Sequence, residues 1–177
     1  MLIAIDATTI CDNDGGVGAG IEHYTWSIVF NLIRLNTSHK FLIIIPKEFS
    51  VIRRNQLMEG VDRVECMEIL GPKIKFLSRH VILPLIFLFK KVDVLFSPFG
   101  QIPLFFRGKS IITIHDVMIY TNPEWFNEEQ KKEFSTRIVV PNSIEKADKI
   151  ICVSNATKIA LNNLFPITIE KSVVVYE

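Results

Sequence analysis

Seven short apolar runs recur along the chain, and most are rich in β-branched residues. They are LIAID (2–6), KFLIIIP (40–46), RVECMEIL (63–70), VDVLFS (92–97), SIITIHD (110–116), KIICVS (149–154) and SVVVYE (172–177). Most of the runs are continuously apolar rather than alternating, which is typical of strands buried on both faces of a parallel sheet. The pattern therefore predicts a mainly parallel sheet of about seven strands.

Helical patterns separate these runs. The clearest spacers are 21–35, 128–147 and a short segment after Ser154. The first carries apolar residues at helical spacing, namely Ile21, Ile28, Leu32 and Leu35. Alternating strands and helices indicate a single α/β domain over residues 1–177, Rossmann-like and doubly wound. Domains of this class bind ligands in the crevice outside the carboxyl ends of their strands.

Length and composition agree with one globular domain. The chain has 177 residues, of which 49% are hydrophobic and 22% charged, so it lies far from the disordered class. A net charge of +1 gives no globally basic surface, and nucleic acid is not an expected partner. The three cysteines, Cys11, Cys66 and Cys152, lack metal-ligand spacing and are expected to be reduced, packed thiols of a cytoplasmic protein.

Neither a signal peptide nor a membrane span is expected. The first residues lack a basic region and resemble a strand. The most apolar segment, 81–89, is far shorter than the roughly 20 residues that a spanning helix needs. Segment 73–91, which runs from Lys73 to Lys91, has cations on both sides of this apolar stretch. It fits a helix lying on the inner face of a membrane, but a core helix that Pro84 kinks or starts is favoured, because an α/β domain needs such helices to cover its sheet.

A glycine-rich loop, DGGVGAG (14–20), precedes the first predicted helix. Its candidate ligand-binding residues are Gly16, Gly18 and Gly20, because glycines at a helix start let backbone N–H groups approach an anion. The loop does not match the dinucleotide fingerprint, and the chain has neither a P-loop nor a G-x-S-x-G elbow. These absences disfavour a nicotinamide enzyme and exclude P-loop kinase and hydrolase functions. A loop whose glycines only permit tight turns is the open alternative.

Polar residues at the ends of predicted strands are the other candidates. His115 follows a strongly apolar run, where it could hydrogen-bond a sugar hydroxyl or a phosphate oxygen, and it is the candidate catalytic residue. The alternative for this histidine is a bond to a loop carbonyl. Candidate substrate-binding residues are Ser97, Asp116 and Ser154, although a turn for Asp116 and a helix cap for Ser154 are common structural roles.

Metal binding is not expected, because His23, His39 and His80 have no second ligand at metal spacing.

Four motifs, in order and spacing, resemble the amino-terminal domain of family 4 glycosyltransferases of the GT-B fold. They are GIEHYT (20–25), RHVILPLIFLFKKVDVLFSPFGQIP (79–103), IITIHDVMIYTNPEWF (111–126) and ADKIICVSNATKIAL (147–161). The resemblance implies half of a GT-B fold, with a second, nucleotide-sugar-binding domain absent from this chain. Glu22 and His23 stand where the family has glycine and a base.

The resemblance also implies roles for single residues. His115 would face the transferred sugar, Gly18 and Gly20 would approach the donor diphosphate or the acceptor, and Ser154 would line the cleft. The implied activity is retaining transfer from a nucleotide-diphosphate sugar to a glycan or lipid-linked acceptor in polysaccharide biosynthesis, without a metal or other cofactor. This half alone would be inactive.

Two other functions stay open at this point. One is a noncatalytic α/β module that binds a glycan or a phosphate-bearing ligand. The other is a subunit that docks a separate donor-binding chain.

Overall fold

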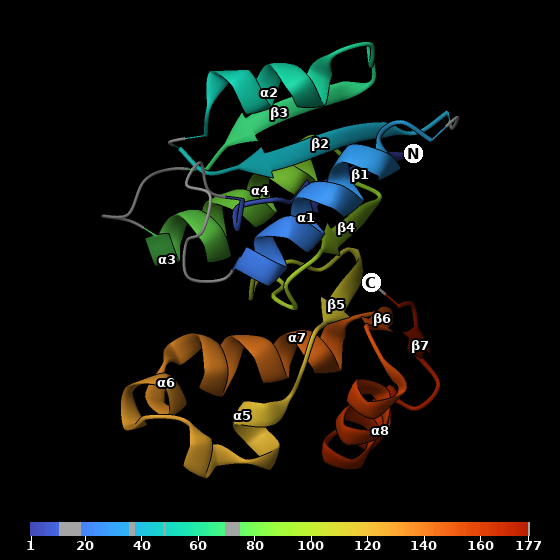
Figure 1. Ribbon diagram of the computed structural model, residues 1–177. Coiled ribbons are helices and arrows are strands. Elements are labelled where there is room, and N and C mark those ends of the chain that lie inside the picture. The colour runs from blue at the N-terminus through green and yellow to red at the C-terminus, as the bar shows by residue number, and fades with distance from the viewer. Residues whose placement is uncertain (11–18, 36–37, 48, 70–74, 177) are drawn as a thin grey trace.

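A parallel seven-stranded sheet organises the protein (Figure 1). The computed structural model describes residues 1–10, 19–35, 38–47, 49–69 and 75–176. The strand order is β3-β2-β1-β4-β5-β6-β7, and every neighbouring pair is parallel. The strands are β1 (Leu2–Asp6), β2 (Lys40–Ile45), β3 (Val64–Glu68), β4 (Val94–Ser97), β5 (Lys109–Ile114), β6 (Lys149–Cys152) and β7 (Ser172–Val174). The predicted Rossmann-like α/β fold is confirmed.

Helices connect the strands and cover the sheet. The α-helices are α1 (Ala19–Leu32), α2 (Val51–Met58), α3 (Lys75–Leu77), α4 (Leu83–Phe89), α5 (Met118–Thr121), α6 (Glu128–Lys132), α7 (Val140–Lys146) and α8 (Asn155–Leu164). Two π-helical turns, η2 (Ser78–Ile82) and η4 (Ser135–Val139), and two 3₁₀ turns, η3 (Pro123–Trp125) and η5 (Pro166–Thr168), complete the described elements. No helix in the described ranges combines the length and apolarity of a membrane span.

The core has two layers, one on each face of the sheet. On one face, Leu42 and Leu95 pack with Phe87 of α4, and α7 and α8 add their own buried residues. On the other face, Ile43 packs with Val29 of α1 and with α2. Burial on both faces explains why the strands are continuously apolar.

The first predicted helix is present, but its buried face differs from the predicted stripe. Ile21 and Leu35 are exposed. The fully buried positions are Thr25, Val29 and Ile33, which follow one another at intervals of four residues. Thr25 belongs to this face because its hydroxyl donates to the carbonyl of Ile21 at 2.7 Å, which satisfies the buried polar group.

The single helix predicted over 128–147 is broken into three pieces. The break falls at Glu133, whose ψ of 135° takes the backbone out of the helical region. Beyond it, Val140 N–H bonds the Ser135 carbonyl in the i→i−5 pattern of a π turn. Pro141 follows at once and has no N–H to continue an α-helical ladder. The same arrangement recurs at η2, where Leu83 N–H bonds the Ser78 carbonyl just before Pro84.

Candidate functional site

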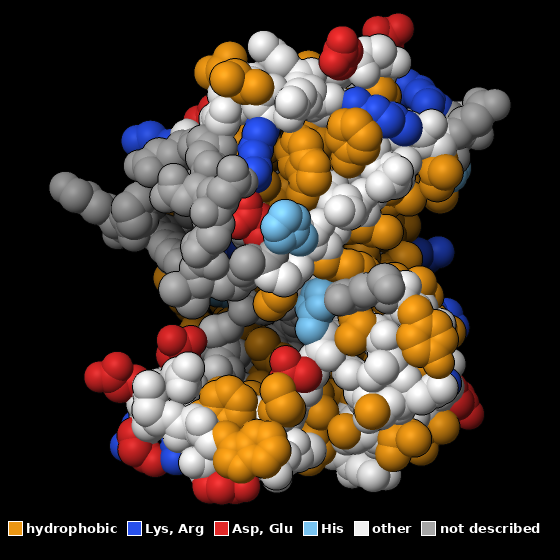
Figure 2. All heavy atoms as spheres, in the orientation of Figure 1, with side chains coloured by type: hydrophobic (Ala, Val, Ile, Leu, Met, Phe, Trp, Pro, Cys, Tyr) orange, Lys and Arg blue, Asp and Glu red, His pale blue; other side chains and the backbone are white. Residues whose placement is uncertain are grey.

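The candidate site lies at the carboxyl edge of the sheet. Asp6, Ser97, His115 and Ser154 end or closely follow β1, β4, β5 and β6, and parallel strands bring these ends to one edge. In Figure 1 the arrowheads of β2 and β3 point to the side on which α3 and α6 project. Figure 2 shows the surface hollowed between the part that carries α1 and the part that carries α6 and α7. Ligand binding at this edge, which the fold class predicts, stays a prediction.

His115 is half-buried and held between two elements. Its Nε2 lies 2.8 Å from the carbonyl of Pro98, and because a carbonyl only accepts, Nε2 carries the proton of this bond. The ring also contacts Tyr24 edge-on, with centroids 4.9 Å apart. The bond to a loop carbonyl, proposed above as the alternative, is therefore present. Its effect is to fix the ring at the site, so a role in ligand contact stays a prediction.

Tyr24 ties the start of α1 to His115. Its hydroxyl lies 3.0 Å from Oγ1 of Thr113 in β5, and its ring touches the histidine. Gly20, the second residue of α1, is exposed and lies one turn before Tyr24 on the same side of the helix. A side chain added there would meet nothing within 4 Å. Gly20 and His115 therefore share one region, whereas Gly16 and Gly18 lie outside the described residues.

Glu22 is turned away from this region. Its carboxylate pairs with Arg53 of α2 at 3.0 Å, and Arg53 also lies over the ring of Trp26. The negative charge of Glu22 is thus neutralised by α2. An anion near the start of α1 would meet the positive end of the helix rather than an unpaired carboxylate.

A buried ion pair stabilises the carboxyl edge of the sheet. Asp6 Oδ2 accepts from Arg79 Nη2 at 2.7 Å, and its Oδ1 accepts from the hydroxyl of Thr8 at 2.6 Å. Arg79 also donates to Thr8 and lies 5.0 Å from the ring centre of Phe99. Its Nε is buried and has no hydrogen-bond partner among the described residues. The pair joins the end of β1 to the π turn η2.

An aromatic wall, made of Phe76, His80 and Phe134, lies beside this ion pair. Phe76 packs against His80 at 4.8 Å and against Phe134 at 5.5 Å, between ring centres, and both phenylalanines are about half exposed. Burial, followed by the charge of Arg79, lowers the pKa of His80 to about 4, so the ring is neutral. Its Nδ1 accepts from the N–H of Leu104. Gln101 adds an amide at this wall by donating to Ser135 at 2.8 Å.

The remaining candidate residues all have structural partners. Ser97 is fully buried, and its hydroxyl accepts from Gln101 N–H at 3.2 Å. Asp116 is exposed and accepts from Met118 N–H at 2.9 Å, before α5. Ser154 is the predicted cap of α8 and accepts from Thr157 N–H at 3.0 Å. These bonds hold the loops of the site in place, and direct ligand contacts by the three residues stay predictions.

The described cysteines behave as packing residues. Cys152 is buried, and burial raises the pKa of its thiol to about 11. Burial likewise raises the pKa of the half-buried Cys66, and both are free thiols. Cys11 lies outside the described residues. In the described part of the chain, no three His, Cys, Asp or Glu side chains gather as a metal site would require.

Sequence patterns did not indicate three features of the site: the Asp6–Arg79 pair, the aromatic wall and Tyr24. Arg79 looked like a basic flank of an apolar helix, and its partner lies 73 positions away. Tyr24 belongs to the GIEHYT motif, and its spacing of four residues from Gly20, which places both on one side of a helix, was the available signal.

The fold is a Rossmann-like α/β domain whose strand-end polar groups gather at the carboxyl edge of the sheet. No protein-family model and no curated protein matches the chain. Solved structures do. The crystal structure of Anabaena Alr3699/HepE in complex with UDP and glucose has a TM-score of 0.58 and 17% identity, over 99% of this chain and 44% of that one.

A glycosyltransferase from Rickettsia africae ESF-5 has a TM-score of 0.57 and 16% identity, over 99% of this chain and 42% of that one. The chain therefore spans less than half the length of these structural neighbours. At such identities the likeness establishes a shared fold, and this fold is one that a glycosyltransferase uses.

Proposed function

We propose that the chain is the acceptor-side half of a retaining glycosyltransferase of the GT-B fold, of the family 4 type. The observation that carries the proposal is the meeting of His115, Tyr24 and the start of α1 at the carboxyl edge, within a fold shared with a glycosyltransferase. The donor would be a nucleotide-diphosphate sugar bound mainly by a second domain. UDP-glucose is the first donor to test, because the HepE structure holds UDP and glucose.

In this function the described groups divide the work. His115, fixed by Pro98 and Tyr24, would contact the transferred sugar. The N–H groups at the start of α1, around Gly20, would face the diphosphate, where the helix dipole favours negative charge. Closure of two domains over the crevice would exclude water and strengthen these interactions. Gly16 and Gly18 would extend the same anion-binding loop.

The aromatic wall suits the acceptor. The exposed faces of Phe76 and Phe134 offer apolar surface on which the C–H face of a sugar ring can stack. The amide of Gln101, beside this wall, would hydrogen-bond the hydroxyls of the sugar. A glycan or a lipid-linked sugar is the acceptor class that such a wall fits. Without the donor half, sugar transfer by the 177-residue chain is not expected.

The experiment measures glycan binding and transfer separately. Ligand-observed NMR on the 177-residue chain, with a panel of oligosaccharides and with UDP-glucose, should find a glycan whose binding weakens about 3- to 10-fold in Phe134→Ala. His115→Ala should weaken it as well. His39→Gln, before β2 at the opposite edge of the sheet, is the matched control and should leave binding unchanged.

Each outcome separates the candidate functions. Glycan binding that is equally strong in Phe134→Ala, His115→Ala and the parent would contradict the proposed acceptor site. Transfer of glucose from UDP-glucose by the 177 residues alone contradicts the assignment as an acceptor-side half. Glycan binding by a chain whose coding region ends at Glu177 would favour the noncatalytic module, whereas a partner that co-elutes and restores transfer would favour the docking subunit.

A further inference from the structure

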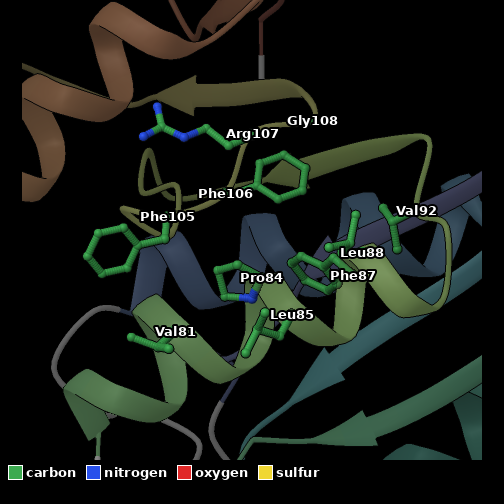
Figure 3. Close-up of a pocket in the computed structure, with 10 residues that line it drawn as sticks. All are labelled: Val81, Pro84, Leu85, Phe87, Leu88, Val92, Phe105, Phe106, Arg107 and Gly108. Atoms are coloured by element: carbon green, nitrogen blue, oxygen red, sulfur yellow. The ribbon is translucent and has the colours of Figure 1, made fainter.

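A groove runs along α4, on the outside of the molecule. The helix and segment 105–108 enclose about 350 Å³ between them (Figure 3). The walls are mostly apolar, with Val81, Pro84, Leu85 and Leu88 on the helix side and Phe105 and Phe106 on the other. Figure 3 shows the ring of Phe105 and the side chains of Val81 and Pro84 on facing sides of the opening.

The apolar character continues from the groove onto the surface. Leu88 is 71% exposed and Phe89 is 82% exposed, and Leu85 and Phe105 are each about half exposed. The inner side of α4 already covers the sheet through Leu83 and Phe87. Helix α4 is therefore apolar on both sides, which covering a sheet does not require. A contiguous exposed apolar surface of this kind marks a contact site.

Cations border this apolar surface. Arg107 lines the groove, and Lys91 and Lys109 are exposed next to its lining residues Val92 and Gly108. Lys146 lies with Arg107 around an adjoining hollow. Of the acidic neighbours, Glu65 pairs with Lys90, and Asp93, which accepts from the N–H of Leu2, keeps its charge. The cations Arg107, Lys91, Lys109 and Lys146 outnumber this carboxylate, so the border is net positive around an apolar centre.

We propose that this face docks on a bilayer that contains anionic phospholipid, with an acyl chain in the groove and a lipid phosphate at Arg107. Apolar side chains surrounded by cations match the layering of a leaflet, in which hydrocarbon lies beneath anionic headgroups. The surface extends beyond segment 73–91, because Phe105 and Arg107 form its second wall.

The docking face adjoins the candidate site. Leu104, which directly precedes the groove residue Phe105, donates its N–H to His80, which belongs to the aromatic wall. If the proposed function holds, a lipid-linked acceptor lying in the membrane would reach the wall without leaving the bilayer. Membrane docking itself needs no sugar transfer, so either proposal can fail while the other stands.

Vesicle flotation tests the docking. The 177-residue chain should float with vesicles of phosphatidylglycerol and phosphatidylcholine, and much less with phosphatidylcholine alone. Leu88→Asp should weaken binding at least tenfold, since a leucine would no longer enter the hydrocarbon. Arg107→Gln should weaken it about fivefold. The matched control is Ile52→Asp on α2, because Ile52 is also 71% exposed but lies away from the groove.

A second variant locates the lipid chain. Phe105→Trp should emit more fluorescence than the parent, which contains Trp26 and Trp125. Lipids that are brominated along their acyl chains should quench this added fluorescence. Equal flotation of Leu88→Asp and Ile52→Asp would overturn the proposal. So would a Phe105→Trp variant whose added emission those lipids leave unchanged. Binding of soluble short-chain phosphatidic acid without any vesicle binding would also overturn it, in favour of a monomeric lipid ligand.

Discussion

The ion pair between Asp6 and Arg79 should be among the most sensitive points of the fold. Their side chains are only 1% and 10% exposed, and the carboxylate is otherwise bonded to Thr8 alone among the described residues. Arg79→Met keeps much of the side-chain length but leaves the Asp6 charge buried without its cation. Breaking a buried pair from one side costs about 3–5 kcal/mol of unfolding free energy. For a domain of this size, that cost corresponds to a fall of about 6–20 °C in Tm.

The coupling between the two charges can be measured separately from the loss caused by either substitution alone. Asp6→Asn leaves the guanidinium buried and should also destabilise, whereas the double variant Asp6→Asn/Arg79→Met removes both charges. The double variant should therefore lose less than the sum of the single losses, by about 2 kcal/mol or more. Urea unfolding followed by circular dichroism measures all four proteins of the cycle.

The control is the exposed pair Arg54–Glu68, which is similarly close at 3.0 Å. A cycle of Arg54→Met and Glu68→Gln should give a coupling energy below about 1 kcal/mol, because water screens both partners. If the Asp6–Arg79 coupling is no larger than this value, burial does not govern the pair and the argument is refuted.

Three further predictions concern stability. His80→Asn should make the free energy of unfolding depend less on pH, because the pKa of His80 is about 4 in the folded protein and 6.5 in the unfolded chain. The parent keeps the full stabilising contribution of neutral His80 above pH 6.5 and loses it as the pH falls from 6.5 to about 4. Between pH 7 and pH 5 the parent should therefore lose about 2 kcal/mol more than the variant in urea titrations. Gly100→Ala should cost about 1–3 kcal/mol, because Gly100 has a φ of 79° and a Cβ there would lie 3.0 Å from Ile114 Cδ1. Gly20→Ala, inside α1 with open space around it, should instead leave stability unchanged or raise it slightly by thermal melting, and a loss comparable to that of Gly100→Ala would contradict the contrast.

The sequence pattern predicted the strands well, because each strand corresponds to one local apolar run. The run LIAID coincides with β1, and the parallel order follows from apolar character on both faces. The cap at Ser154 was equally local, since serine before a helical run accepts the helix's own N–H.

The errors fall where distant residues decide. Nothing in EEQKKEFS marks the turn at Glu133, because its neighbours are good helix formers. The buried face of α1 passes through Thr25, which a count of apolar positions overlooks. Asp6 and Arg79 meet only after the sheet is assembled, so no window of the sequence contains both.

Because of the π turn η2, the number of residues between Arg79 and Pro84 decides where the Arg79 side chain points, more than the types of those residues do. A π turn is an α-helix that accommodates one additional residue, and each residue advances an α-helix by about 100°. Deletion of one residue between Arg79 and Pro84 would restore an ordinary helical ladder while preserving most of the composition. It would also rotate the guanidinium of Arg79 around the helix axis, away from Asp6. In related chains, alignment gaps should therefore avoid this short stretch even where its letters vary.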